Sequence, residues 1–256
     1  GSRGERHAGA DVFARMSLGE KILANLITPE TTLFRFSEGE LEALDREILP
    51  GLRGRTAEIL IVPPRPLPPG PVNGDPLAKI CPRGKRVMVL SRLSGEKNIT
   101  SAIDAFQKHI QPSVPDAHLI LVGDGPDRTR LEGYAKGDPR IHFVGHVDNP
   151  QVHAHLVYAD LFLYTSLSET HGLVVEEAKR GGLPIVAFDD RRGVAQQVTA
   201  ANCGILVEPG ETDGLGRAAV KLLNDEPLRR EMGRRAKEHQ ALDSRPVQVF
   251  FPDLFL

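Results

Sequence analysis

Short apolar runs recur along the chain from residue 87 onward. They occupy six segments, which are 87–90, 119–122, 141–144, 161–164, 184–188 and 205–207. Each run is almost continuously hydrophobic, as is typical of a strand in a sheet that is covered on both faces. We therefore predict six buried strands.

The segments between these runs show helical spacing. After residue 98, apolar residues recur at intervals of three and four and would share one helical face. These residues are Ile99, Ala102, Ile103, Phe106 and Ile110. Two more amphipathic segments, 215–223 and 228–236, are interpreted as helices that pack on the same domain. The alternation predicts an α/β fold with a Rossmann-like, doubly wound parallel sheet, in which ligands bind beyond the carboxyl ends of the strands.

The region before residue 63 has fewer elements. Ser37 and Glu40 match a capping box that would begin a helix, with strands expected at 31–36 and 58–62. This strand, helix, strand pattern is too small for a large sheet, so it is interpreted as part of a truncated α/β domain.

Prolines concentrate between Pro63 and Pro71. Proline lacks an amide hydrogen and fixes φ, so this run is predicted to be an extended linker. The expected domains are a partial amino-terminal domain at 1–62, a Pro-rich linker at 63–80, a Rossmann-like domain at 81–240 and a tail at 241–256.

Composition narrows the class of protein. The 256 residues are 40% hydrophobic and 26% charged, which is typical of a soluble globular protein. The net charge of -2 gives no sign of a nucleic-acid partner. Cys81 and Cys203 lie far apart, which argues against a disulfide framework and favours a reducing, cytoplasmic compartment. No apolar run approaches the ~18 residues of a membrane span.

Two loops after predicted strands have distinctive sequences. Arg92 and Lys97 flank a turn between a strand and a helix, where backbone N–H groups and the helix dipole favour an anion such as a diphosphate. The same residue types also occur in ordinary solvated loops. The segment 123–126, Gly-Asp-Gly-Pro, is interpreted as a turn, and it lacks the lysine of a Walker loop, which disfavours ATP hydrolysis.

The loop after the fourth predicted strand carries two carboxylates. Glu169 and Glu177 are eight positions apart, with Gly172 between them at an expected helix start. Carboxylates accept hydrogen bonds from sugar and ribose hydroxyls, and the amides of Gly172 and Leu173 suit an anion. Glu176 is predicted to face solvent, because adjacent helical positions point about 100° apart.

Histidine and cysteine patterns predict no metal site. His153 and His155 form an H-x-H pattern, but no Asp or Cys nearby completes a ligand set, so a surface role is expected. Cys203 is interpreted as a buried small residue rather than a nucleophile.

Several of these pieces occur together in a characteristic order. They are Ser91-Arg92 with Lys97, Gly-Asp-Gly-Pro at 123–126, Phe143-Val144-Gly145, and Glu169 through Ala178. Together they resemble the carboxyl-terminal donor-binding domain of a GT-B glycosyltransferase of the retaining, GT4-like family (glycosyl transferases group 1), over about residues 85 to 240. The most specific piece is the E-x7-E motif from Glu169 to Glu177.

The resemblance implies a hexosyltransferase that uses a UDP- or GDP-linked sugar donor, retains the anomeric configuration and needs no metal or other cofactor. Arg92 and Lys97 would neutralise the donor diphosphate and the charge that develops on it. Glu169 would contact the donor sugar near the reaction centre, so these three residues are the predicted catalytic set.

The resemblance also implies further donor contacts. Glu177 would bind the ribose hydroxyls, and backbone amides at His171, Gly172 and Leu173 would meet phosphate or sugar oxygens. Backbone around Val147 would hold the base.

The chain also departs from the family pattern. Only about 60 residues stand where the family has a comparable amino-terminal domain for the acceptor, and Gln196 stands where many members have Glu. The acceptor is therefore unknown, and any peripheral membrane association is expected through the part of that domain not found. A non-catalytic nucleotide-sugar-binding or interaction protein and a GT-B-type sugar epimerase remain alternatives.

Overall fold

The computed structural model describes residues 72–167 and 172–243, which lie in a compact unit formed by residues 66–245. The elements expected before residue 63 lie outside the described residues. The domain boundaries given above stay predictions.

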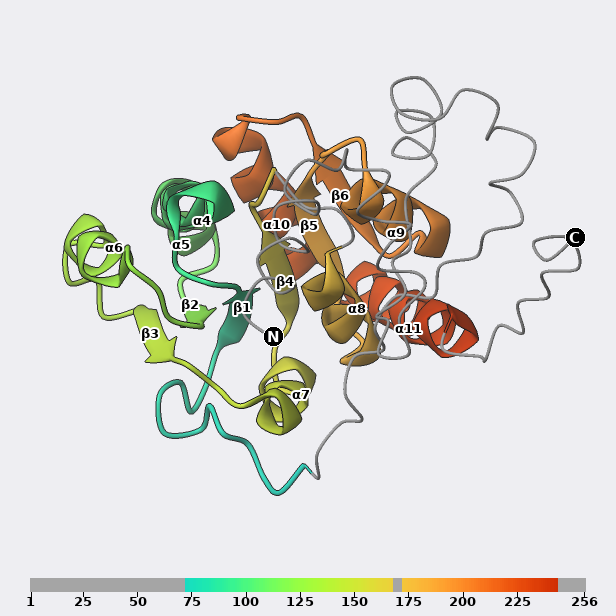
Figure 1. The fold of residues 1–256 in the computed structure, drawn as a ribbon, viewed down its shortest axis with the longest axis horizontal. Helices are drawn as coiled ribbons and strands as arrows, with labels where there is room; N and C mark the ends of the chain where they lie inside the picture. The colour runs from blue at the N-terminus through green and yellow to red at the C-terminus, as the bar shows by residue number, and fades with distance from the viewer. Residues whose placement is uncertain (1–71, 168–171, 244–256) are drawn as a thin grey trace, which may run out of the picture. The chain divides into compact units, whose positions relative to one another are not determined.

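Parallel strands form a six-stranded sheet in the described unit (Figure 1). They are β1 (Lys85–Leu90), β2 (Ala117–Val122), β3 (Ile141–Gly145), β4 (Leu161–Tyr164), β5 (Ile185–Phe188) and β6 (Gly204–Val207). Their order is β3-β2-β1-β4-β5-β6, which confirms the predicted fold class and all six strands. The order reverses between β1 and β4, and ligands of doubly wound folds bind in the crevice beyond this switch point.

Helices cover both faces of the sheet (Figure 1), as the continuous apolar runs require. In β1, Val87 and Val89 join one apolar cluster, whereas Met88 and Leu90 join the other. The first cluster takes in α4 (Ile99–Ala105), α6 (Arg128–Tyr134) and α10 (Thr212–Asn224). The second takes in α7 (Asn149–Val157), α8 (Leu173–Arg180), α9 (Gly193–Ala201) and Ala236 of α11 (Glu226–Asp243).

The predicted apolar helical face after residue 98 is confirmed, since all five of its residues are buried. The helix is not uniformly α, because α4 continues into a wider π-helical turn, η4 (Phe106–Ile110), and then α5 (Gln111–Ser113). Pro112 explains the departure: it lacks the amide hydrogen that an α-helix would donate to the carbonyl of Lys108, and its ring would crowd that carbonyl.

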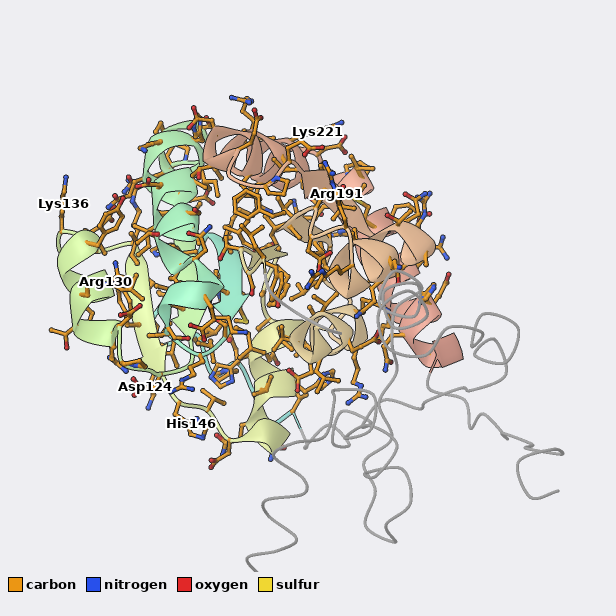
Figure 2. All side chains as sticks on the ribbon, turned by 45° about the horizontal axis from the view of Figure 1, so that its top comes forward. Asp124, Arg130, Lys136, His146, Arg191 and Lys221 are labelled. Carbon is orange, nitrogen blue, oxygen red and sulfur yellow. The ribbon has the colours of Figure 1, made fainter. Side chains whose placement is uncertain are left out.

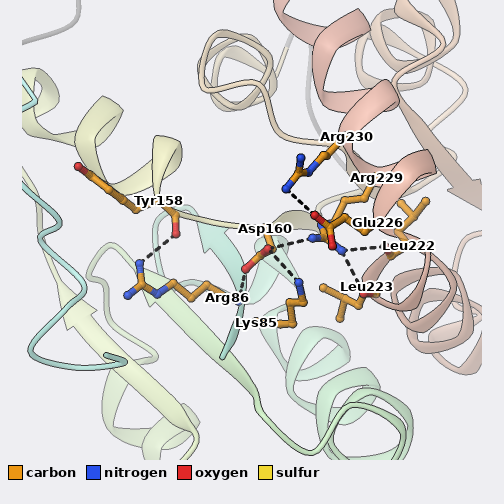
Figure 3. A network of polar contacts seen from close by, with 9 residues as sticks. All are labelled: Lys85, Arg86, Tyr158, Asp160, Leu222, Leu223, Glu226, Arg229 and Arg230. Atoms are coloured by element: carbon orange, nitrogen blue, oxygen red, sulfur yellow. Dashed lines mark hydrogen bonds and ion pairs between the residues drawn. The ribbon is translucent and has the colours of Figure 1, made fainter. Parts of the chain in front are cut away.

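An ionic network closes the amino ends of the strands (Figure 3). The Asp160 carboxylate accepts the backbone N–H of Arg86 at 2.9 Å. It also lies 3.7 Å from Lys85 Nζ and 3.4 Å from Arg229 Nη2. Arg229 donates to the carbonyl oxygen of Leu223 at 3.0 Å, where α10 ends. These side chains stabilise the amino-terminal edge of the sheet, opposite the carboxyl edge at which ligands of this fold bind.

Residues 72–80, the last part of the predicted linker, pack against the same end of the sheet. Asp75 Oδ2 lies 2.7 Å from Arg86 Nη1, and Leu77 is fully buried in the second apolar cluster. This part of the chain therefore contributes to the core. Among the described residues, no helix is both long enough and apolar enough to span a membrane.

Candidate functional site

The loop between β1 and α4 forms the first part of the candidate site. Arg92 is exposed and Lys97 is half-buried, and the buried Leu93 anchors the loop between them. Lys97 ends a short 3-10 turn, η3 (Gly95–Lys97), and Asn98 then adopts a left-handed conformation with φ of 51°. Both predicted cations therefore stand on a shaped turn at the carboxyl end of β1.

An acidic residue that sequence reasoning left out lies between these cations. The Glu96 carboxylate accepts a hydrogen bond from Ser94 Oγ, which is the main cause of its lowered pKa. A backbone hydrogen bond, Lys97 and Arg92 lower that pKa further. Glu96 is thus ionised at neutral pH and offsets part of the positive charge of the loop.

The turn predicted at 123–126 is confirmed only in part, because the turn lies at residues 126–127 and is closed by the Arg128 N–H donating to the carbonyl oxygen of Gly125 at 3.1 Å. The glycine-rich turn, residues 123–127, packs directly against the Arg92 loop. A Cβ atom at Gly123, where φ is 128°, would lie 1.9 Å from the carbonyl oxygen of Ser91. At Gly125 it would lie 2.3 Å from that of Leu93. The Leu93 N–H donates to the carbonyl oxygen of Asp124 at 3.0 Å. Glycine is required here because two backbones meet, and the turn supports the cationic loop.

The end of β3 joins the same cluster of loops. The Gly123 N–H donates to the carbonyl oxygen of Gly145 at 2.8 Å. Beyond Gly145, His146 is exposed and Val147 is half-buried against the second apolar cluster. Asp124 and His146 consequently lie at the same edge of the molecule (Figure 2).

Hydrogen bonds tie the β4 loop to the β1 loop across the switch point. Thr165 Oγ1 donates to the carbonyl oxygen of Lys97 at 2.7 Å, and Ser166 Oγ donates to that of Glu96 at 3.5 Å. Thr165 and Ser166 are buried, whereas Lys97 is half-buried and Glu96 is exposed, so these bonds lie at the boundary of the core. Glu169 and His171 come next in the chain but lie outside the described residues, so their roles stay predictions.

The predicted helix start is confirmed at α8. Gly172 is its N-cap residue in a left-handed conformation with φ of 70°, and a Cβ atom there would lie 2.7 Å from Val194 Cγ2. Glycine therefore lets α8 begin close against α9. Leu173 is 40% exposed, which leaves the first position of α8 open to a ligand.

Glu177 has an environment suited to receiving hydroxyl groups. It is half-buried, and burial raises the pKa of its carboxyl group while Arg180 opposes the shift. In the part of the chain that the structure describes, no hydrogen bond reaches this carboxylate. Its oxygens are therefore available to accept from a ligand.

The prediction that Glu176 faces solvent is wrong. Its carboxylate Oε1 lies 3.0 Å from Nζ of Lys179, and the lysine side chain is fully buried. The prediction was based on the helical position and charge of Glu176 alone. A carboxylate that is paired with an ammonium group can be buried together with it.

A surface role for His155 is also wrong. His155 is buried, and its Nδ1 lies 3.0 Å from the carbonyl oxygen of Gln151. Among residues 72–167 and 172–243, no three His, Cys, Asp or Glu side chains gather as a metal set. Cys203 is buried as predicted, and burial raises the pKa of its thiol to about 11.

Six of the eight predicted site residues are therefore described, and all six lie on segments that follow the carboxyl ends of β1, β3 and β4. They are Arg92, Lys97, Val147, Gly172, Leu173 and Glu177. These segments carry two cations, glycine-lined backbone and the Glu177 carboxylate, and all of them follow strands at the carboxyl edge of the sheet.

Comparison with known proteins relates this arrangement to a family. The profile of the family described as Glycosyl transferases group 1 matches residues 80–239. N-acetyl-alpha-D-glucosaminyl L-malate synthase from Bacillus anthracis is 34% identical over 157 residues, which are 60% of this chain and 40% of that protein. Trehalose synthase from Rubrobacter xylanophilus is 34% identical over 164 residues, or 60% of this chain and 38% of that protein.

Solved structures share the fold. Sucrose-phosphate synthase from Thermosynechococcus elongatus matches with a TM-score of 0.65 at 22% identity, over 90% of this chain and 58% of that one. Anabaena HepE in complex with UDP and glucose matches with a TM-score of 0.54 at 25% identity, over 62% of this chain and 44% of that one. The chain spans about two fifths of the length of the two curated relatives, at 40% and 38%.

Proposed function

The chain belongs to the family of glycosyl transferases group 1, and on that premise we propose that its described unit binds a nucleoside-diphosphate sugar for retaining, metal-independent hexosyl transfer. The observation that carries the proposal is the hydrogen bond from Thr165 to the Lys97 carbonyl. It joins the cationic turn to the loop that leads to α8, which supports one donor site shared by groups suited to phosphate and to hydroxyls.

In this proposal the diphosphate lies against Arg92 and Lys97. When the bond between the anomeric carbon and the diphosphate oxygen breaks, negative charge grows on the leaving group. Cationic side chains placed on the turn after β1 stabilise that charge more in the transition state than in the ground state, which lowers the barrier. They take the part that a metal ion plays in other transferases. The ionised Glu96 keeps the loop from being purely cationic before the donor binds.

The remaining donor contacts follow the loop order. Glu177 accepts from the ribose hydroxyls, and the amides of His171, Gly172 and Leu173 meet phosphate or sugar oxygens. Backbone around Val147 holds the base, and Glu169 contacts the donor sugar beside the reacting carbon. The complex of Anabaena HepE with UDP and glucose supports a uridine donor, with a guanosine donor as the alternative.

Hexosyl transfer by the whole protein is part of this proposal, which names no particular acceptor or sugar. A reducing, cytoplasmic setting is proposed from Cys81 and Cys203, which are both free and buried. A non-catalytic protein would bind the nucleotide without transferring sugar, and an epimerase would interconvert sugars without an acceptor.

Isothermal titration with UDP and GDP tests the donor site. The Arg92→Ala, Lys97→Ala double variant should weaken binding by at least about 100-fold, since each charge-assisted hydrogen bond contributes about 1.5–3 kcal/mol. Arg191→Ala is the matched control, because this exposed arginine follows β5 at the same edge and pairs with Glu208 at 3.4 Å. Wild-type protein that binds neither nucleotide, or a double variant that binds as well as wild type, would contradict the proposal.

A further inference from the structure

Arg128, in the first turn of α6, connects three segments at the carboxyl edge of the sheet. Its Nη2 donates to the carbonyl oxygen of Phe143 in β3 at 3.2 Å. Its Nη1 lies 3.5 Å from Asp124 Oδ2 in the glycine-rich turn, and its Nε donates to Glu132 Oε1 at 2.8 Å. One guanidinium thus contacts the end of a strand, a neighbouring loop and its own helix.

The strand end that Arg128 contacts is irregular. Leu121 of β2 pairs with Phe143, but the next residue, Val122, pairs with Gly145, so the register skips Val144. Such a bulge bends its strand and re-aims the side chains and backbone beyond it. In this chain the residues beyond the bulge are His146 and Val147.

Two further contacts show that this bent end is closely packed. A Cβ atom at Gly145, where φ is 89°, would lie 3.1 Å from Arg128 Nη1. The guanidinium therefore lies directly against the Gly145 backbone. The Gly145 carbonyl oxygen also accepts the Gly123 N–H. Gly145 thus contacts both the arginine and the glycine-rich turn.

The planar guanidinium is suited to this task. It presents several N–H donors in fixed directions, so one side chain can serve a backbone carbonyl and two carboxylates together. The ion pair with Glu132, the main cause of the raised pKa of Arg128, keeps the side chain stretched along α6.

We propose that Arg128 is a positioning residue that holds the bulged end of β3 so that the backbone at 145–147 can receive the nucleobase of the donor. The inference rests on the proposed function, because it takes the base to lie against Val147. It goes further because it assigns the two parts of the donor to different residues. Arg128 positions the backbone that binds the base, and Arg92 with Lys97 binds the diphosphate.

Titration with two probes separates these supports. For Arg128→Ala, the affinity for UDP should fall about tenfold, the equivalent of one net hydrogen bond. The affinity for inorganic pyrophosphate, which has no base, should stay unchanged. Arg130→Ala is the control, because Arg130 lies on the same helix and pairs with Asp127 at 3.0 Å instead of with β3 (Figure 2). This control should bind both probes as wild type does.

Hydrogen exchange gives a readout that needs no ligand. In Arg128→Ala, the amide of Gly123 and those of residues 141–147 should exchange faster, while Arg130→Ala should leave them unchanged. Arg128→Lys should be intermediate, because one ammonium group cannot reproduce the planar set of contacts.

The outcomes separate this inference from the function on which it rests. A wild-type chain that binds neither UDP nor GDP would overturn the proposed function, and the nucleobase role with it. If wild type binds UDP, unchanged affinity or unchanged exchange in Arg128→Ala would overturn the positioning role alone. Equal weakening of UDP and pyrophosphate would also overturn it, because the defect would not be confined to the base.

Discussion

Lys179 and Glu176 form an ion pair one helical turn apart on α8, with 3.0 Å between Nζ and Oε1 and the lysine fully buried. Burying two charges is costly, and their attraction offsets that cost only while both are present. Lys179→Met should therefore destabilise the protein by roughly 3–5 kcal/mol, because it leaves the Glu176 carboxylate buried and uncompensated. Denaturant unfolding measures this loss.

The double variant Glu176→Leu, Lys179→Met provides the sharper test. Replacing a buried ion pair by apolar side chains is often neutral or stabilising, so the double variant should recover most of the lost stability. Lys221→Met on α10 is the control, because Lys221 is exposed (Figure 2) and should change stability little. A double variant as unstable as Lys179→Met would show that the pair is needed for more than mutual compensation.

Gly172→Ala should disturb the start of α8 in two ways. Its φ of 70° costs a residue with a side chain roughly 1–2 kcal/mol. The new methyl group would also meet Val194 Cγ2 at 2.7 Å, so either the Val194 side chain or the packing of α8 against α9 must shift. We expect a lower melting temperature and weaker UDP binding, measured by calorimetry.

Two further variants separate strain from collision at Gly172. Gly210→Ala has a φ of 86° but nothing within 4 Å of the new methyl group, so it should show the strain alone. Adding Val194→Ala to Gly172→Ala should relieve the collision and restore part of the nucleotide affinity. An equal loss of stability in Gly210→Ala and Gly172→Ala would rule out a contribution from close packing of the two helices.

The strands were predictable from the sequence because burial on both faces needs continuous apolar runs. The start of β1 was not, since the run begins at Val87 but the strand begins at Lys85. Arg86 is polar yet buried, because Asp75, Asp160 and the carbonyl oxygen of Tyr158 receive its hydrogen bonds. Partners this distant in sequence leave no local pattern.

The location of the candidate site was predictable for a related reason. Once strands alternate with helices, chain order alone assigns Arg92, Lys97 and Gly172 to loops at the carboxyl edge of the sheet. The environments of Glu96 and Glu176 were not predictable. The first depends on a side-chain bond from Ser94, and the second on the burial of Lys179 in the folded unit. The contacts of Glu169 stay a prediction.

His118 and His142 should make stability depend on pH. Their rings stack, with 3.0 Å between Nδ1 and Nε2, and burial lowers the pKa of both. Arg140 lowers the pKa of His118 further, while Asp116 opposes that shift. Because the folded pKa values lie below the unfolded value of about 6.5, the unfolded state takes up protons first. Stability should be full above that pH and fall as the pH drops through the folded values.

Thermal unfolding between pH 8 and pH 5 checks this expectation. Replacing both histidines by Asn should flatten the decline relative to wild type. His146→Asn should leave the decline unchanged, because His146 is exposed (Figure 2). A decline as steep in the double variant as in wild type would assign the pH dependence to other groups.

Glu177→Gln should raise the stability of the protein and weaken its binding of UDP. Burial raises the folded pKa of Glu177 above its usual 4.5, so the ionised carboxylate is penalised in the folded state at neutral pH. Gln removes that penalty, and the melting temperature at pH 7 should rise, with the gain vanishing near pH 4, where Glu177 is protonated.

UDP binding should weaken in the same variant, because a carboxylate accepts ribose hydroxyls more strongly than a neutral amide. Glu238→Gln, at an exposed position on α11, is the control. Lower stability at pH 7 together with unchanged UDP affinity would give Glu177 a structural role instead.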